Sequence, residues 1–168
     1  LCAPAGNDLP FDESLCEQGR NFSNKIWNAF RLIKGWEIND IEQQQASIDG
    51  IKWFENKLYS TIKEIDISFS KYRISEALML TYKLVWDDFC SQYLEIIKPD
   101  YQQPIDEETY NKTILFLENI LKLLHPFMPF LSEEIWHLID ERKSDIIITK
   151  WPEAKSIDKQ LINDFNNT

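Results

Sequence analysis

The sequence is short of glycine, proline and cysteine and has no long apolar run. Four glycines and seven prolines in 168 residues are too few for many short strands, so long helices are favoured. The three cysteines, Cys2, Cys16 and Cys90, fit neither a disulfide framework nor a zinc pattern and predict free thiols in a reducing, cytoplasmic compartment. No uncharged apolar run approaches the roughly 20 residues of a membrane span, so no membrane partner is expected.

Acidic residues are absent from one stretch of an otherwise acidic chain. With 28 acidic and 18 basic residues, the net charge is −10, which argues against a surface that binds nucleic acid everywhere; DNA is not expected as a partner. Between Glu17 and Glu37, however, no acid occurs. That stretch carries Arg20, Lys25, Arg31 and Lys34, interleaved with Asn21, Asn24 and Asn28. We expect a negatively charged partner to bind there.

Apolar residues recur at helical spacing in five segments and predict an all-α, antiparallel bundle of about five helices. The expected helices are 12–33, 47–69, 75–97, 106–124 and 132–142, with Ser47 and Ser132 as N-caps of the second and fifth. Ile146–Ile148 and Trp151 predict a short extended C-terminal segment that packs on the bundle. The expected layout is a connector at 1–11, a helical domain at 12–152 and a truncated segment at 153–168.

Two leucines fall outside the apolar faces of their predicted helices. At about 100° per residue, Leu32 lies on the polar side of the first helix, where Asn21, Lys25, Asn28 and Arg31 also lie. Leu94 lies off the apolar face of the third helix, near Lys98. Cations can position a phosphate backbone, Asn can read a base edge, and an apolar side chain can lie against an unstacked base. The residues alone leave open single-stranded RNA, solvent or a protein interface.

No catalytic residue and no metal ligand is predicted. The sequence has no Gly-rich phosphate loop, no GxSxG and no HExxH motif. His125 precedes Pro126 at the end of a predicted helix and favours a structural role.

Three segments closely resemble the anticodon-binding domain of valyl-tRNA synthetase, a class I aminoacyl-tRNA synthetase. GRNFSNKIWNAFR at residues 19–31 is similar to the opening helix of that domain, and VWDDFCSQYLE at 85–95, followed by Lys98-Pro99, is similar to its third helix. LLHPFMPFLSEEIW at 123–136 resembles a signature shared by the valine, isoleucine and leucine enzymes. PAGND at 4–8 resembles the connector from a catalytic domain.

The resemblance implies a module of valine-tRNA ligase that binds the anticodon stem-loop of tRNA(Val). By position within the motifs, the anticodon contacts fall on Lys25 and Leu32, then on Leu94 and Lys98. Asn21, Asn28 and Arg31 are added from the helical wheel. The implied partners are that tRNA and the catalytic domain of the same parent chain, which attaches valine using ATP and magnesium. No cofactor and no catalysis are expected of this piece alone.

The sequence leaves two alternatives and one departure from the family pattern. An isoleucyl-tRNA synthetase domain would keep the fold but change the anticodon, and a helical protein-interaction module would place Leu32 and Leu94 in a hydrophobic patch. Ser91 and Gln92 stand where the family often shows Asp and Trp, and Ser14 stands where some relatives carry a base-contacting Arg. One of the anticodon contacts that the family makes can therefore be missing or replaced in this chain.

Overall fold

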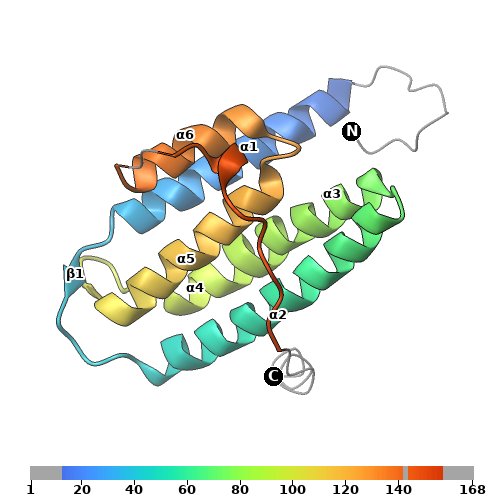
Figure 1. The fold of residues 1–168 in the computed structure, drawn as a ribbon. Helices are drawn as coiled ribbons and strands as arrows, with labels where there is room; N and C mark the ends of the chain where they lie inside the picture. Colours follow the sequence, from blue (N-terminus) through green and yellow to red (C-terminus); the bar gives the residue numbers. More distant parts are fainter. Residues whose placement is uncertain (1–12, 142–143, 157–168) are drawn as a thin grey trace.

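Five helical rods make up most of residues 13–141 and 144–156, which the computed structural model describes (Figure 1). The rods are α1 (Glu13–Lys34), α2 (Gln45–Ser70), a third rod, α5 (Glu107–Leu124) and α6 (Pro129–Ile139). The third rod runs without a break through α3 (Ile74–Lys83), η1 (Leu84–Tyr93) and α4 (Leu94–Ile97). The predicted all-α helical bundle is confirmed. The predicted connector at 1–11 and residues 157–168 of the predicted C-terminal segment lie outside the described residues.

A two-residue parallel strand pair, which the sequence did not predict, ties two loops together at one end of the bundle. Strand β1 (Ile38–Asn39) follows α1, and β2 (Ile105–Asp106) precedes α5. Ile38 pairs with Ile105, and the Ile105 N–H donates to the Glu37 carbonyl at 2.8 Å. The end of α1 is therefore joined to the loop that follows α4, as the left of Figure 1 shows.

The core is centred on Phe54, a fully buried side chain of α2. Its ring lies 5.3 Å from that of Phe89, 4.9 Å from Tyr93 and 5.1 Å from Phe116, measured between centroids. Two of these rings come from η1 and the third from α5, so the cluster joins three rods. The buried Tyr93 hydroxyl hydrogen-bonds to Thr113 of α5 at 2.8 Å, which satisfies a polar group that would otherwise be costly to bury.

Helix α2 approaches α4 closely at Gly50. A Cβ atom added at Gly50 would lie 3.0 Å from Cγ2 of Ile96. At that separation the Ile96 side chain would have to move by a few tenths of an ångström to admit a larger residue at position 50.

Residues Leu84–Tyr93 of the third rod form a π-helix. In a π-helix, hydrogen bonds join residues five apart, and each turn therefore holds more residues than an α-turn does. The Ser91 hydroxyl shows the same spacing, because it donates to the carbonyl of Trp86, five residues earlier, at 2.8 Å. Over ten residues this winding changes which side chains face the core.

The predicted N-caps of the second and fifth helices are wrong. Helix α2 starts before Ser47, because Gln45 and Ala46 are compatible with a helix and the Ile48 N–H already donates to the Gln44 carbonyl. Helix α6 starts at Pro129, whose fixed φ suits the first helical position, and it ends at Ile139. Ser132 therefore lies inside α6, where its Oγ donates to the Met128 carbonyl.

The chain after α6 returns to the bundle, as predicted. Trp151 donates from Nε1 to Asp66 Oδ1 at 3.0 Å, and its ring lies 5.8 Å from that of Phe69. The expectation of an extended run at residues 146–148 is wrong, since Ile146–Ile148 form a single 3-10 turn, η2. The Ile146 N–H donates to the Glu133 carboxylate, which holds that turn against α6. Among the described helices, none has the length and apolar character to cross a membrane.

Replacing Phe54 with alanine should destabilise the fold strongly. Removing a fully buried aromatic side chain leaves a cavity between three rods, and we expect the free energy of unfolding to fall by roughly 3–5 kcal/mol. Phe130→Ala is the matched control, because the Phe130 ring is 91% exposed and its loss should change stability by less than about 0.5 kcal/mol. Urea unfolding followed by circular dichroism measures both; equal midpoints would contradict the assignment of Phe54 to the core.

Candidate nucleic-acid interface

Four predicted site residues form a single line along α1, here called the α1 stripe. Asn21, Lys25, Asn28 and Leu32 follow one another at spacings of four, three and four residues, which places them above one another on a helix. The two asparagines and Leu32 are exposed, and Lys25 is half-buried. Leu32 is 42% exposed, so its predicted place on the polar side of α1 is confirmed.

Arg31 is exposed beside the α1 stripe rather than in it. Neighbouring residues on a helix point about 100° apart, so Arg31 projects to one side of Leu32. Lys34, one turn from Arg31, donates from Nζ to the Ile139 carbonyl at 3.1 Å and so faces α6. Among the cations of the acid-free stretch, Lys34 therefore links α1 to α6 through this hydrogen bond.

The Lys25 ammonium lies over an aromatic ring of the third rod. Its Nζ is 5.3 Å from the centroid of the Trp86 ring, within the range of a cation–π interaction. Trp86 stacks on Tyr82 at 5.7 Å and 10°, and Tyr82 lies 4.6 Å from the buried ring of Phe22. The half-buried indole is thus supported from the core and holds Lys25 at the seam between α1 and η1.

No carboxylate of the described residues approaches the Lys25 ammonium within 4.0 Å. The positive charge of Lys25 instead interacts electrostatically with the buried thiol of Cys90. Burial raises the pKa of Cys90 to about 11, and the charge of Lys25 acts in the opposite direction. An anion arriving at this seam would meet a cation without having to displace an acidic side chain.

Lys98 lies at the end of α4, where its N–H donates to the Leu94 carbonyl at 2.9 Å. Its ammonium forms an ion pair with Glu95, and the two side chains are 47% and 56% exposed. Exposed pairs of this kind contribute only about 0.2–1 kcal/mol. The ammonium can therefore exchange Glu95 for a phosphate at small cost.

The prediction that Leu94 lies off the buried face is wrong. Its side chain is 2% exposed and belongs to the core. The helical wheel assumed α-helical winding from residue 75 to 97, whereas ten of these residues wind as a π-helix. A π-helix rotates by a smaller angle per residue than an α-helix does, and over the length of η1 this difference turns Leu94 towards the core. In this structure Leu94 supports the third rod and offers no surface to a ligand.

The structure brings the predicted residues in the last turn of α1 and at the end of α4 to one end of the bundle. Helix α1 packs against η1, and the β1–β2 pair joins the end of α1 to the loop after α4 (Figure 1). Leu32, in the last turn of α1, and Lys98, at the end of α4, therefore lie at the same end. Asn21 and Lys25 continue the surface along α1 towards the other end.

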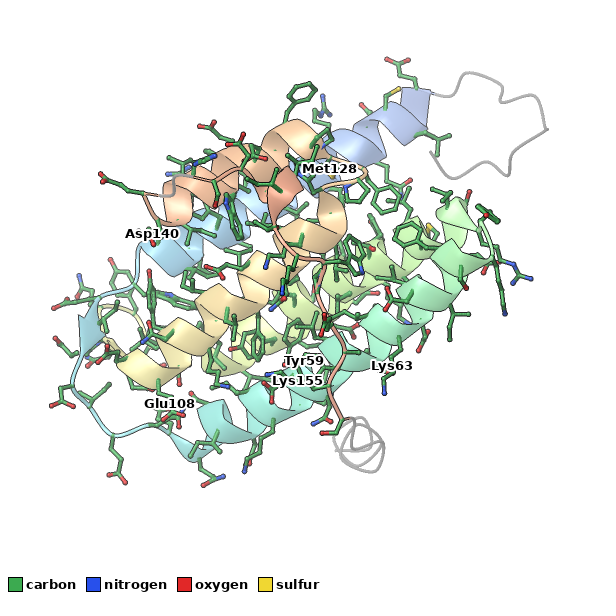
Figure 2. The ribbon with its side chains drawn as sticks, in the orientation of Figure 1. Tyr59, Lys63, Glu108, Met128, Asp140 and Lys155 are labelled. Atoms are coloured by element: carbon green, nitrogen blue, oxygen red, sulfur yellow. The ribbon has the colours of Figure 1, made fainter. Side chains whose placement is uncertain are left out.

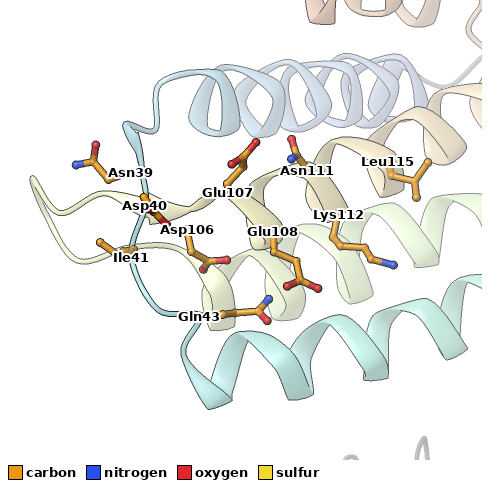
Figure 3. Close-up of a pocket in the computed structure, with 10 residues that line it drawn as sticks. All are labelled: Asn39, Asp40, Ile41, Gln43, Asp106, Glu107, Glu108, Asn111, Lys112 and Leu115. Carbon is orange, nitrogen blue, oxygen red and sulfur yellow. The ribbon is translucent and has the colours of Figure 1, made fainter.

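An acidic hollow of about 590 Å³ lies at this end of the bundle, between the loop after α1 and the start of α5. Figure 3 shows that Asp40, Asp106, Glu107 and Glu108 line it. The one cation in its lining, Lys112, forms an ion pair with Glu55 at 3.7 Å. The negative charge of the hollow therefore disfavours phosphates.

Three side chains that could bind a metal ion lie together where the sequence predicted none. The ligand atoms of Glu133, His137 and Asp145 lie within 4.8 Å of one another. His137 Nε2 is 3.0 Å from Glu133 Oε1 and 3.3 Å from Asp145 Oδ1. The four-residue spacing of Glu133 and His137 was visible in the sequence, whereas the approach of Asp145 was not. Glu133 also accepts the Ile146 N–H, so contacts between protein groups account for the arrangement.

Comparison with known proteins assigns the family. Residues 51–167 match the family described as the anticodon-binding domain of tRNA ligase. The chain belongs to this family. The match begins inside α2 and includes the whole third rod, with Trp86 and Lys98, so the domain resemblance inferred from the sequence is confirmed.

Individual relatives extend the likeness of this anticodon-binding domain over α1. The valine–tRNA ligase of Parabacteroides distasonis is 56% identical over 168 residues, which cover 98% of this chain. The valine–tRNA ligases of Christiangramia forsetii and Porphyromonas gingivalis are 55% and 53% identical and cover 99% and 100% of it. The domain spans only 19–20% of the length of these relatives.

Thiol labelling of the domain tests the placement of Cys90 beside Lys25. In a Cys2→Ser/Cys16→Ser variant, Cys90 should react slowly with a disulfide reagent at pH 8, because a buried thiol with a pKa near 11 is almost fully protonated there. The rate should rise with pH towards 11, and adding Lys25→Ala should slow it further, since the thiolate loses a stabilising charge. A Cys2→Ser/Cys90→Ser variant, which keeps the exposed Cys16, is the control. Equal rates for the two thiols would contradict the buried environment.

Proposed function

We propose that this domain binds the anticodon loop of tRNA(Val) as part of a cytoplasmic valine–tRNA ligase. The observation that carries the proposal is Lys25, a cation held over Trp86 without an acidic partner among the described residues, in a stripe that ends at the exposed Leu32. The family match and the names of the most similar relatives support the partner. The parent enzyme would join valine to the tRNA with ATP and magnesium in a part of the chain other than this one.

The predicted site residues of α1 and α4 contact different parts of the RNA loop in this proposal. Lys25 attracts the backbone or an electronegative base edge of the loop, and Arg31 contacts phosphate from the side. The amides of Asn21 and Asn28 can both donate to and accept from a base edge. Leu32 lies against an unstacked base, which single-stranded loops offer and duplexes do not. At the end of α4, Lys98 exchanges Glu95 for a phosphate.

The catalytic part of the same parent chain is the second proposed partner. An apolar hollow of about 300 Å³ lies beside the start of α1, and Leu15, Phe22, Met79 and Phe127 contribute to its lining. Leu15 and Met79 are 43% and 48% exposed. Because the relatives are about five times longer than this domain, we propose that the preceding part of the parent covers this hollow.

The burial of Leu94 weakens the alternative of a protein-interaction module. That hypothesis needed a hydrophobic patch containing both Leu32 and Leu94, and Leu94 lies in the core. What remains is one exposed leucine among polar and cationic side chains, which suits a nucleic acid loop better than an apolar partner.

Reversing the charge of Lys25 should weaken binding of a tRNA(Val) anticodon stem-loop by about tenfold. Each phosphate contact also contributes to the salt dependence, so Lys25→Glu should lower the slope of log K against log salt by about one. Lys63→Glu makes the same charge change at an exposed position of α2 and should leave both quantities unchanged (Figure 2). Fluorescence anisotropy over a salt series measures them. Equal losses in the two variants would contradict a local site on α1.

Changing the middle base of the valine anticodon should cost about 1–3 kcal/mol of binding free energy, if Leu32 and the asparagines contact bases. The isoleucine anticodon stem-loop, tested in the same assay, separates the valine domain from an isoleucine domain by its relative affinity. Equal affinity for all three loops would contradict base recognition and leave only charge attraction.

A further inference from the structure

The turn that follows α4 presents an aromatic ring to solvent. The side chain of Tyr101 is 89% exposed. The turn is closed by a hydrogen bond from the Gln103 N–H to the Asp100 carbonyl at 2.9 Å, and Gln102 adopts a left-handed backbone with φ 62°. Pro99 and Pro104 flank it. The faces of the ring are open to solvent, and the closed turn already fixes its backbone.

The position of this turn places Tyr101 beside the proposed binding surface. Lys98 lies three residues before Tyr101, and the pairing of β2 with β1 starts at Ile105, four residues after it. Because β1 follows α1, the turn is held at the end of the bundle where Leu32 also lies (Figure 1). A loop of RNA that contacts Leu32 and Lys98 therefore comes within the neighbourhood of an exposed, flat, apolar surface.

We propose that Tyr101 stacks on an unstacked base of the RNA loop bound at this end, and this inference rests on the proposed function. Every base has a π-face, so a single exposed ring can hold a base without regard to its identity. The contact would complement the other residues, since Lys25 and Lys98 attract phosphates and the asparagines read base edges. The face of the ring carries the interaction, so the hydroxyl is not required.

Tyr72 provides a matched control within the same domain. Its side chain is 90% exposed, and it also lies in a tight turn between two helices, with φ 57°. That turn joins α2 to α3 at the end of the bundle opposite β1 (Figure 1). The two tyrosines thus share exposure and a place in a turn between elements, and they lie at opposite ends of the bundle.

The test is binding of the tRNA(Val) anticodon stem-loop, with 2-aminopurine in the loop, to the wild-type chain and to Tyr101→Ala, Tyr101→Phe and Tyr72→Ala. We expect Tyr101→Ala to weaken binding by about tenfold and to abolish the stacking-induced fluorescence change. Tyr101→Phe and Tyr72→Ala should each stay within about twofold of wild type. The salt slope should be unchanged in Tyr101→Ala, since stacking releases no counterions, whereas Lys25→Glu reduces it.

The outcomes separate this inference from the proposed function. If the wild-type chain binds, Lys25→Glu weakens binding and Tyr101→Ala does not, the stacking proposal is overturned while the anticodon function stands. If the wild-type chain does not bind the stem-loop, both are overturned. Equal losses in Tyr101→Ala and Tyr72→Ala would also overturn the stacking proposal, because they would show a general effect of removing an exposed ring. Thermal unfolding of each variant confirms that the fold is retained.

Discussion

The π-helical winding of residues 84–93 decides how the third rod is used on both of its sides. On the core side, the rings of Phe89 and Tyr93 lie 5.3 and 4.9 Å from that of Phe54. On the α1 side, Trp86 lies half-buried beneath the Lys25 ammonium. π-Helical segments are rare and frequently occur at functional sites. The core and the proposed interface therefore depend on the same ten residues.

The distribution of acidic side chains over the surface also bears on the proposed site. The chain carries a net charge of −10, so its average field repels RNA. The acid-free stretch of α1 locally reverses that field, while the hollow lined by Asp40, Glu107 and Glu108 reinforces it on the neighbouring surface. In the proposed function, this distribution of charge would favour an RNA loop on the α1 face over the surface of the hollow. The acidic residues around the proposed site would therefore restrict the position of the loop by repulsion, although they do not attract it.

The parts of this picture that local patterns determine could be read from the sequence. The period of an ordinary helix placed Leu32 on the exposed side of α1, and the Asp106 carboxylate accepts the Thr109 N–H at the start of α5, where first-turn chemistry had predicted a helix. The same reasoning placed Leu94 on the wrong side of the third rod, because the spacing of apolar residues does not reveal a change from α-helical to π-helical winding. The two-residue strands were too short to produce an alternating pattern, and the Lys25–Trp86 contact joins residues 61 positions apart.

The two lysines of the proposed site differ in what an arriving phosphate has to displace. Lys98 already has Glu95 as a partner, and the exposed pair offers only a small barrier to exchange. Lys25 rests on an aromatic face, which supplies some attraction but occupies no carboxylate partner. An anion that approaches Lys25 has no carboxylate to displace among the described residues. Lys25 should therefore supply the larger share of the charge contact, and Lys98 should adjust to the loop once it is bound.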